Sequence, residues 1–369
     1  LVSLPDKVFS HSESPTLLLM ARKKGKPVYP NSIFKFSEVS TAGLPEFKEL
    51  GKVSRKEEAR ASLFKAPNYS FSVPPLLSVW LRLGNNTKLG KIADVLTGRR
   101  YNKGLKKNNP SMIISTHPKE GWDKGVIDIK QQLQPFFIQD VCYLNPDRNL
   151  ILHDGPTSKY NEPKIIINAT RASRGHWRLK AALDNSGLVF HRNFYGVFLK
   201  DNAKKISLPF LTAVLNGPVA NAYIFTHSST KWSNSKDIES IHMPSQMDME
   251  DMEIEYIEAL VKKYVELAQN TSESEECHKI LLEIDAFILE KYSLPPKLEK
   301  QLLDFFRGQE RPTYCEFREY YPADFTAAFP LHEMISENFG RIKTKEILKM
   351  MPDYSDPEII NFFKHIARK

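Results

Sequence analysis

The segment LPFLTAVLNGPVANAYIFTHSSTKW, Leu208 to Trp232, holds two apolar helix patterns on either side of Asn216-Gly217-Pro218. Glycine commonly ends a helix and proline commonly starts one, so the sequence predicts two consecutive helices with a break at this tripeptide. The apolar residues expected to bury both halves are Val214, Leu215, Val219, Tyr223 and Ile224. Only the polar tail is a candidate for ligand contact, through Lys231, Trp232 and Asn234.

The chain has 369 residues, of which 41% are hydrophobic, and this is enough for two or three domains. Its formal net charge of +8 divides into −9 for residues 247–291, with 13 Asp and Glu against 4 Lys and Arg, and +17 for the rest. A basic body of this kind favours a polyanionic partner, most simply nucleic acid.

The sequence carries no signal for a membrane or for secretion. No window approaches the roughly 18 apolar residues of a membrane span, and the first twenty residues lack the order of a signal peptide. The cysteines, Cys142, Cys277 and Cys315, lie far apart without a CxxC pair, so neither a disulfide framework nor a zinc ribbon is implied. We expect a cytoplasmic protein without membrane contact.

The pattern along the chain predicts an α+β fold. An apolar run at Leu17–Met20 reads as a buried strand, and residues 44–64 read as a helix within a connector at 29–84. Residues 85–245 contain short β-rich runs separated by Gly, Pro, Asn and Asp, which indicates an irregular β-rich domain. Residues 246–310 show three helical patterns, a small bundle, and a mostly helical segment follows at 311–369.

The usual catalytic motifs are missing from the sequence. No Gly-x-Gly pair exists for a nucleotide or cofactor turn, and LHEMIS, residues 331–336, has no second zinc ligand after His332, so no catalytic residue or metal ligand is predicted. One alternative stays open: Asp147, Glu162 and Lys164 match the loose PD-ExK pattern of magnesium-dependent nucleases.

Three basic clusters with interleaved amides, hydroxyls and aromatics predict DNA binding: GRRYNKGLKKNN (98–109), NATRASRGHWRLK (168–180) and THSSTKWSNSK (226–236). Arginine forks suit guanine edges, and lysines suit phosphates. The predicted DNA-binding residues are Arg99, Arg100, Tyr101, Lys106, Lys107, Arg171, Ser173, Arg174, His176, Arg178, Lys231, Trp232 and Asn234.

Several of these stretches resemble a known family. LGKIADVLTGRR (89–100), PKIIINATRASRG (163–175) and LPFLTAVLNGPVANAYI (208–224) followed by KWSNSKDIESIHMP (231–244) are similar to the target-recognition domains of TaqI-type adenine DNA methyltransferases and type I restriction-modification specificity subunits. Residues 1–25 resemble the last strand pair of the methyltransferase domain, and the last sixty residues match the family only vaguely. Together with the pattern along the chain, the resemblance predicts domains at 1–28, 29–84, 85–245, 246–310 and 311–369.

The resemblance implies sequence-specific recognition of double-stranded DNA for an N6-adenine methyltransferase of a restriction-modification or phage-defence system. The family's NPPY loop and cofactor loop are absent, since NNPSMI (108–113) lacks the second proline and the aromatic residue. S-adenosylmethionine is therefore expected in a catalytic domain or subunit outside this chain, and a restriction subunit is a further candidate partner. The competing hypotheses are the nuclease and a non-enzymatic scaffold.

Overall fold

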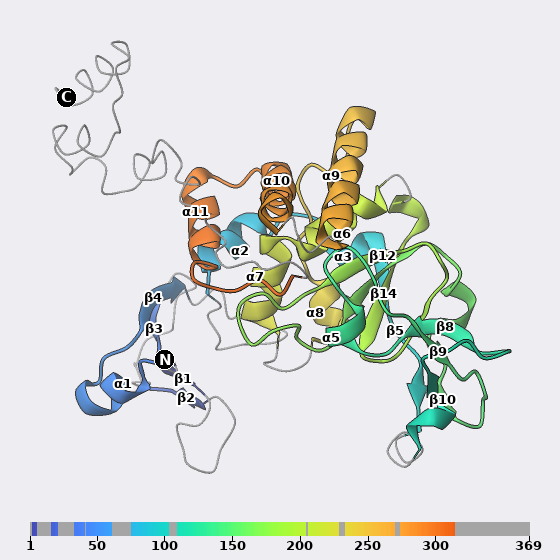
Figure 1. Ribbon diagram of the computed structural model, residues 1–369. Helices are drawn as coiled ribbons and strands as arrows, with labels where there is room; N and C mark the ends of the chain where they lie inside the picture. Colours follow the sequence, from blue (N-terminus) through green and yellow to red (C-terminus); the bar gives the residue numbers. More distant parts are fainter. Residues whose placement is uncertain are drawn as a thin grey trace. The chain divides into compact units, whose positions relative to one another are not determined.

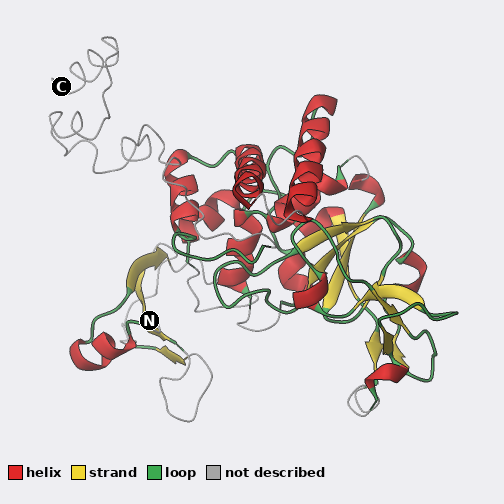
Figure 2. Cartoon of the chain, in the orientation of Figure 1, coloured by secondary structure: helices red, strands yellow, loops and turns green. Residues whose placement is uncertain are grey.

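The computed structural model describes residues 2–5, 16–20, 33–40, 42–60, 75–102, 109–203, 206–228, 233–269 and 274–313. The chain divides into two compact units, Leu1–Leu77 and Ser78–Lys369. Helices and strands alternate irregularly along the chain, and the strands form several small sheets (Figures 1 and 2). The predicted α+β class is therefore confirmed.

The first unit is a four-stranded sheet in the order β2-β1-β3-β4 with one short helix. Its elements are β1 (Val2–Leu4), β2 (Thr16–Leu18), β3 (Ile33–Glu38), α1 (Leu44–Leu50) and β4 (Arg55–Arg60).

Two expectations for the first unit were wrong. The apolar run after Thr16 is a strand only to Leu18, and its end is exposed, with Met20 at 78% exposure. The helix expected over 44–64 stops at Leu50, because Gly51 takes a left-handed conformation with φ 67° and its N–H caps the Phe47 carbonyl at 2.9 Å. The residues that follow form β4, which pairs with β3.

The second unit is built around an antiparallel sheet in the order β12-β11-β14-β5. Its strands are β5 (Ala93–Thr97), β11 (Lys164–Asn168), β12 (Ala181–Asp184) and β14 (Phe194–Leu199). Every residue of β11 is buried, as the continuous KIIIN pattern requires for a central strand.

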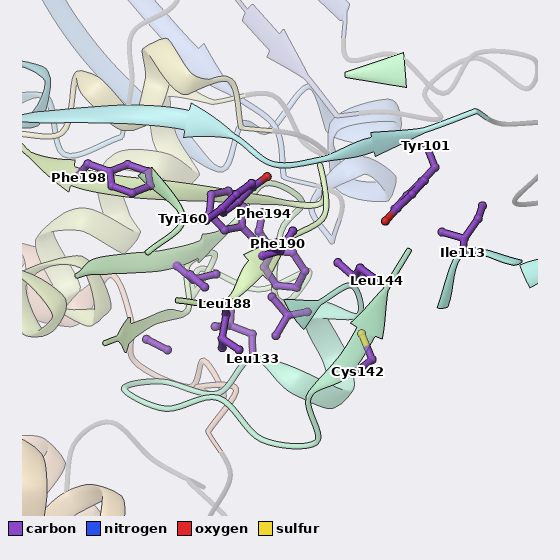
Figure 3. Close-up of a cluster of buried hydrophobic side chains, with 14 of the residues drawn as sticks. Tyr101, Ile113, Leu133, Cys142, Leu144, Tyr160, Leu188, Phe190, Phe194 and Phe198 are labelled. Carbon is purple, nitrogen blue, oxygen red and sulfur yellow. The ribbon is translucent and has the colours of Figure 1, made fainter. Parts of the chain in front are cut away.

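A smaller lobe extends this sheet with a four-stranded sheet, β13-β8-β9-β7, and a two-stranded ribbon, β10-β6. Its strands are β6 (Arg100–Tyr101), β7 (Ile114–Ser115), β8 (Asp123–Val126), β9 (Cys142–Leu144), β10 (Ile151–His153) and β13 (Val189–Phe190). Figure 3 shows one apolar cluster that runs from Phe198 on the central sheet through Phe190 and Phe194 to Leu144 and Tyr101. The lobe and the central sheet therefore share a core.

The second unit contains nine α-helices among its described residues. They are α2 (Leu77–Leu83), α3 (Leu89–Ile92), α5 (Ile129–Gln132), α6 (Leu208–Asn216), α7 (Pro218–His227), α8 (Ser235–Glu239), α9 (Asp251–Gln269), α10 (Ser274–Tyr292) and α11 (Pro296–Asp304). The three helices expected after residue 245 are thus confirmed as α9, α10 and α11; α9 and α10 pack on α6, and α11 packs on α7 (Figure 1).

The break between α6 and α7 is confirmed, and side chains on either side of it explain its place. The Asn216 amide pairs with both the N–H and the carbonyl of Ala181, at 2.9 and 2.8 Å. The Asn221 Oδ1 accepts from the N–H groups of Arg178 and Leu179, at 2.8 and 2.7 Å. The two helices meet at a bend of 52°. At this bend the two asparagine side chains form hydrogen bonds to the backbone that leads into β12.

Among the described residues, no individual helix has the length and apolar composition of a membrane span; α6 and α7 meet that test only when taken together across their bend. Both are largely buried in the unit. Of the described cysteines, Cys142 is a free, buried thiol, whereas Cys277 in α10 is disulfide-bonded, which the cysteine spacing did not predict.

Candidate nucleic-acid interface

The three basic clusters of the sequence meet at one end of the central sheet. Because β14 runs antiparallel to both β5 and β11, the ends of β5 and β11 lie beside the start of β14. Backbone hydrogen bonds join the segments that follow: Arg192 N–H to the Arg99 carbonyl at 2.8 Å, Ala169 N–H to the Asn193 carbonyl at 2.7 Å, and Ser233 N–H to the Ala169 carbonyl at 3.0 Å. We call this region the sheet-end site; it comprises Arg99–Arg100, Ala169–Arg171, Arg192–Asn193 and Ser233–Asn234.

A glycine permits the close crossing at the centre of the site. A Cβ on Gly98 would lie 2.1 Å from the Phe190 carbonyl oxygen, far inside any real contact. The absence of a side chain lets the chain pass the 190–192 segment, where the Arg99 N–H donates to that same carbonyl at 2.8 Å. Gly98 is therefore required to bring the two arginine-bearing segments together.

Two predicted residues of the first cluster have internal partners. Arg99 is 3% exposed, and its guanidinium forms ion pairs with Asp123 at 2.7 Å and Asp154 at 2.6 Å. The buried Tyr101 hydroxyl donates to the Asn145 carbonyl at 2.6 Å. These side chains tie β6 to the smaller lobe. Lys106 and Lys107 fall outside the described residues.

The second cluster forms the loop between β11 and β12, and Asn168 closes its base. The Asn168 amide donates to the carbonyls of Thr170 and Arg178, at 2.6 and 2.8 Å, and its Oδ1 accepts from the Lys180 N–H at 2.6 Å. Inside the loop, the Ser173 hydroxyl donates to the Trp177 carbonyl at 2.7 Å. Ser173 is thus used to shape the loop.

The far side of this loop packs against the segment after α11. The His176 ring stacks on Phe305 at 4.1 Å and its Nδ1 donates to the Phe305 carbonyl at 2.6 Å. Burial, foremost, lowers the pKa of His176. Trp177 is 1% exposed and belongs to the core.

Arg178 is also packed inside the unit. Its guanidinium lies 4.5 Å from the centre of the Phe225 ring, and the residue is 8% exposed. Burial, together with the charge of Arg171, lowers the pKa of Arg178 to about 10. Arg171 is half-buried and Arg174 is exposed, whereas Trp177 and Arg178 are buried.

In the third cluster, Lys231 and Trp232 lie outside the described residues. Asn234 is exposed and caps α8: its side chain accepts from the backbone of Asp237, and its N–H donates to the Asp237 carboxylate at 3.0 Å. This reciprocal capping box fixes the chain beside the sheet-end site.

Sequence reasoning missed Arg192, which sits on the tight turn before β14. Like Arg100 it is half-buried. Over the part of the chain that the structure describes, Arg100, Arg174 and Arg192 form no ion pair, and the buried Nε of Arg100 has no hydrogen-bond partner. The available signal was weak, since Arg192 stands alone in HRNF and has no basic neighbour beyond His191.

The nuclease alternative is opposed by the position of Lys164. This lysine is fully buried, and its Nζ lies 2.6 Å from the Asp184 carboxylate and 2.5 Å from the Tyr160 carbonyl. Glu162 is exposed, and the Asp147 carboxylate accepts a hydrogen bond from the Asn149 N–H within its own turn. Within the described ranges, no group of three or more His, Cys, Asp or Glu residues could hold a metal ion.

Comparisons with known proteins give limited matches. No family model and no curated protein matches the chain. Among solved structures, a type I restriction-modification system assembly matches with a TM-score of 0.31 and 12% identity, over 63% of this chain and 49% of that one. The type IIL restriction-modification enzyme MmeI in complex with DNA matches with a TM-score of 0.41 and 8% identity, over 74% of this chain and 40% of that one.

This chain thus spans about half, or less, of the length of the proteins it matches. At these TM-scores neither likeness carries an argument about the activity of the chain. The argument for function rests on the sheet-end site.

Proposed function

We propose that this chain reads DNA for a restriction-modification methyltransferase, and that the sheet-end site is the surface that meets the duplex. The observation that carries the proposal is the convergence of the three basic segments, with Arg100, Arg171 and Arg192 held on neighbouring backbone at one sheet end. Loops on a rigid sheet suit recognition, because the scaffold fixes the direction in which they enter a groove.

Methyl transfer to adenine N6 belongs, in this proposal, to a catalytic domain or subunit that binds S-adenosylmethionine. The chain has no Gly-x-Gly turn for such a cofactor, so we assign its residues only to DNA binding and to docking. The acidic helices α9 and α10 are proposed as the docking side, since acidic surface disfavours DNA and leaves the basic end of the sheet to the duplex.

The test compares a variant of the site with a matched control. Arg100→Ala/Arg171→Ala removes two positive charges from the sheet-end site, and Lys262→Ala/Lys279→Ala removes two exposed charges from α9 and α10. Binding is measured by fluorescence anisotropy with a random-sequence 30-bp duplex pool at two salt concentrations.

We expect the site variant to bind at least ~10-fold more weakly and to lose about one unit of salt slope per lost phosphate contact, while the control binds as the parent does. A parent chain that binds no duplex, or a site variant that keeps the parent's affinity and salt slope, would overturn the proposal.

A further inference from the structure

The turn His191–Phe194 is held by hydrogen bonds to three other segments. It closes through the Phe194 N–H and the His191 carbonyl at 2.9 Å. The His191 N–H donates to Val126 in β8 at 2.9 Å, the Asn193 amide donates to the Ile127 carbonyl at 3.1 Å, and the Asn193 carbonyl accepts from Ala169. The Arg192 N–H, at the tip, donates to Arg99. The backbone of this turn is therefore fixed from every side.

The side chains of the turn have different tasks. His191 is 3% exposed and stacks on Tyr101, and Asn193 is committed to the Ile127 carbonyl. Arg192 is partly exposed, and across the described residues its guanidinium has neither an ion pair nor a hydrogen bond. The neighbouring Arg99 differs, because its guanidinium already donates to the carboxylates of Asp123 and Asp154.

We propose that Arg192 is a base-reading residue, whose guanidinium pairs with O6 and N7 of one guanine in the major groove. This inference rests on the proposed DNA recognition. A contact to phosphate needs only a mobile charge, whereas a bidentate contact to a base edge needs a planar fork on fixed backbone, and the pinned turn supplies that backbone. Arg100 and Arg171, on the two adjoining segments, supply charge for the phosphates on either side.

The experiment selects bound sequences from a pool of random 30-bp duplexes with the full chain. The parent is compared with Arg192→Ala, Arg192→Lys and the control Lys279→Ala, which removes an exposed charge on α10. Arg192→Gln is a second neutral variant should Arg192→Ala fail to fold, as judged by circular dichroism. The readout is the base preference at each position of the enriched motif, together with affinity for the winning duplex.

We expect the parent motif to contain a guanine whose preference falls about 10-fold or more in Arg192→Ala and also in Arg192→Lys, with the other positions unchanged. The Lys279→Ala control should enrich the parent motif. If Arg192→Ala enriches the parent motif unchanged, Arg192 does not read a base although the chain still reads DNA.

A full rescue by Arg192→Lys would likewise overturn base reading, because a lysine keeps the charge but lacks the fork. A parent that enriches no motif would overturn the proposed function and this inference with it. The two failures are thus distinguishable.

Discussion

Two asparagine side chains at the α6–α7 break form hydrogen bonds to backbone groups that a neighbouring β-strand would otherwise satisfy. Asn216 and Asn221 are 2% and 0% exposed, and their side chains satisfy backbone groups of Arg178, Leu179 and Ala181. A buried N–H without an acceptor costs about 1–3 kcal/mol, so the cost of losing either asparagine exceeds the loss of one hydrogen bond.

Asn221→Ala is expected to lower the free energy of unfolding by about 2–4 kcal/mol, because it strands two buried N–H groups at once. Urea denaturation followed by circular dichroism measures this. The exposed Asn161→Ala is the control and should change stability by no more than about 0.5 kcal/mol. A loss in Asn221→Ala as small as that of the control would show that the side-chain edge contributes little.

A histidine in the same region should make the stability of the protein depend on pH. His242 is 6% exposed, and burial, with the charges of Lys88 and His227, lowers its pKa to about 4. Since the folded-state pKa lies below the ordinary value of 6.5, protonation favours the unfolded chain. The penalty is absent above about pH 7 and grows as the pH falls from 6.5 toward 4.

His242→Gln should therefore lose less stability than the parent when the pH drops from 7 to 5, by about 1–2 kcal/mol. Urea midpoints at both pH values test this. The exposed His117→Gln should follow the parent. Equal slopes for His242→Gln and the parent would mean that His242 is not the responsible group.

At the scale of elements, one ion pair fixes the helices to the sheet-bearing part of the second unit. Arg311, which follows α11, pairs with Asp285 of α10 at 2.6 Å, donates to the Asn216 carbonyl of α6 at 2.7 Å, and lies 4.2 Å from the centre of the Trp177 ring. Both charged residues are at most 3% exposed. Removal of one partner leaves an uncompensated charge in the core.

Arg311→Ala should destabilise the protein by about 3–5 kcal/mol, because the buried Asp285 carboxylate would lose its ion pair with Arg311. The double variant Arg311→Met/Asp285→Leu should recover much of that loss, since apolar side chains of similar size avoid the desolvation penalty. Thermal unfolding of both variants tests the pair. A double variant no more stable than Arg311→Ala would indicate that the hydrogen bond to Asn216 dominates.

The elements differ in how far the sequence could predict them. The α6–α7 break and the helices α9 to α11 follow from local signals, namely apolar spacing, Gly217 and the prolines at helix starts. The burial of His176 could not be predicted from local signals, because its partner Phe305 lies 129 residues further along the chain. Arg192 was missed for a related reason, since its place beside Arg99 depends on the pairing of β5 with β14.

For the molecule as a whole, the uneven charge has a structural counterpart. Most of the acidic residues of 247–291 lie on α9 and α10, whereas the half-buried Arg100 and Arg192, which form no ion pair in the described part of the chain, lie at the sheet end. In the proposal, helices α9 and α10 form the docking side and the sheet-end site forms the DNA side. Variants in the two regions can therefore test the two functions separately.

The asparagine pair also bears on how the protein behaves at high concentration. Strand β12 is an outer strand of the central sheet, and an outer strand with free backbone groups invites strands from other molecules. Here the outward N–H and carbonyl of Ala181 are already taken by Asn216, and α8 packs beside β5 at the opposite edge. The Phe136 N–H also donates to the Ala181 carbonyl at 2.7 Å, so this edge is partly covered. We expect loss of Asn216 to expose the Ala181 N–H and to promote self-association as well as unfolding.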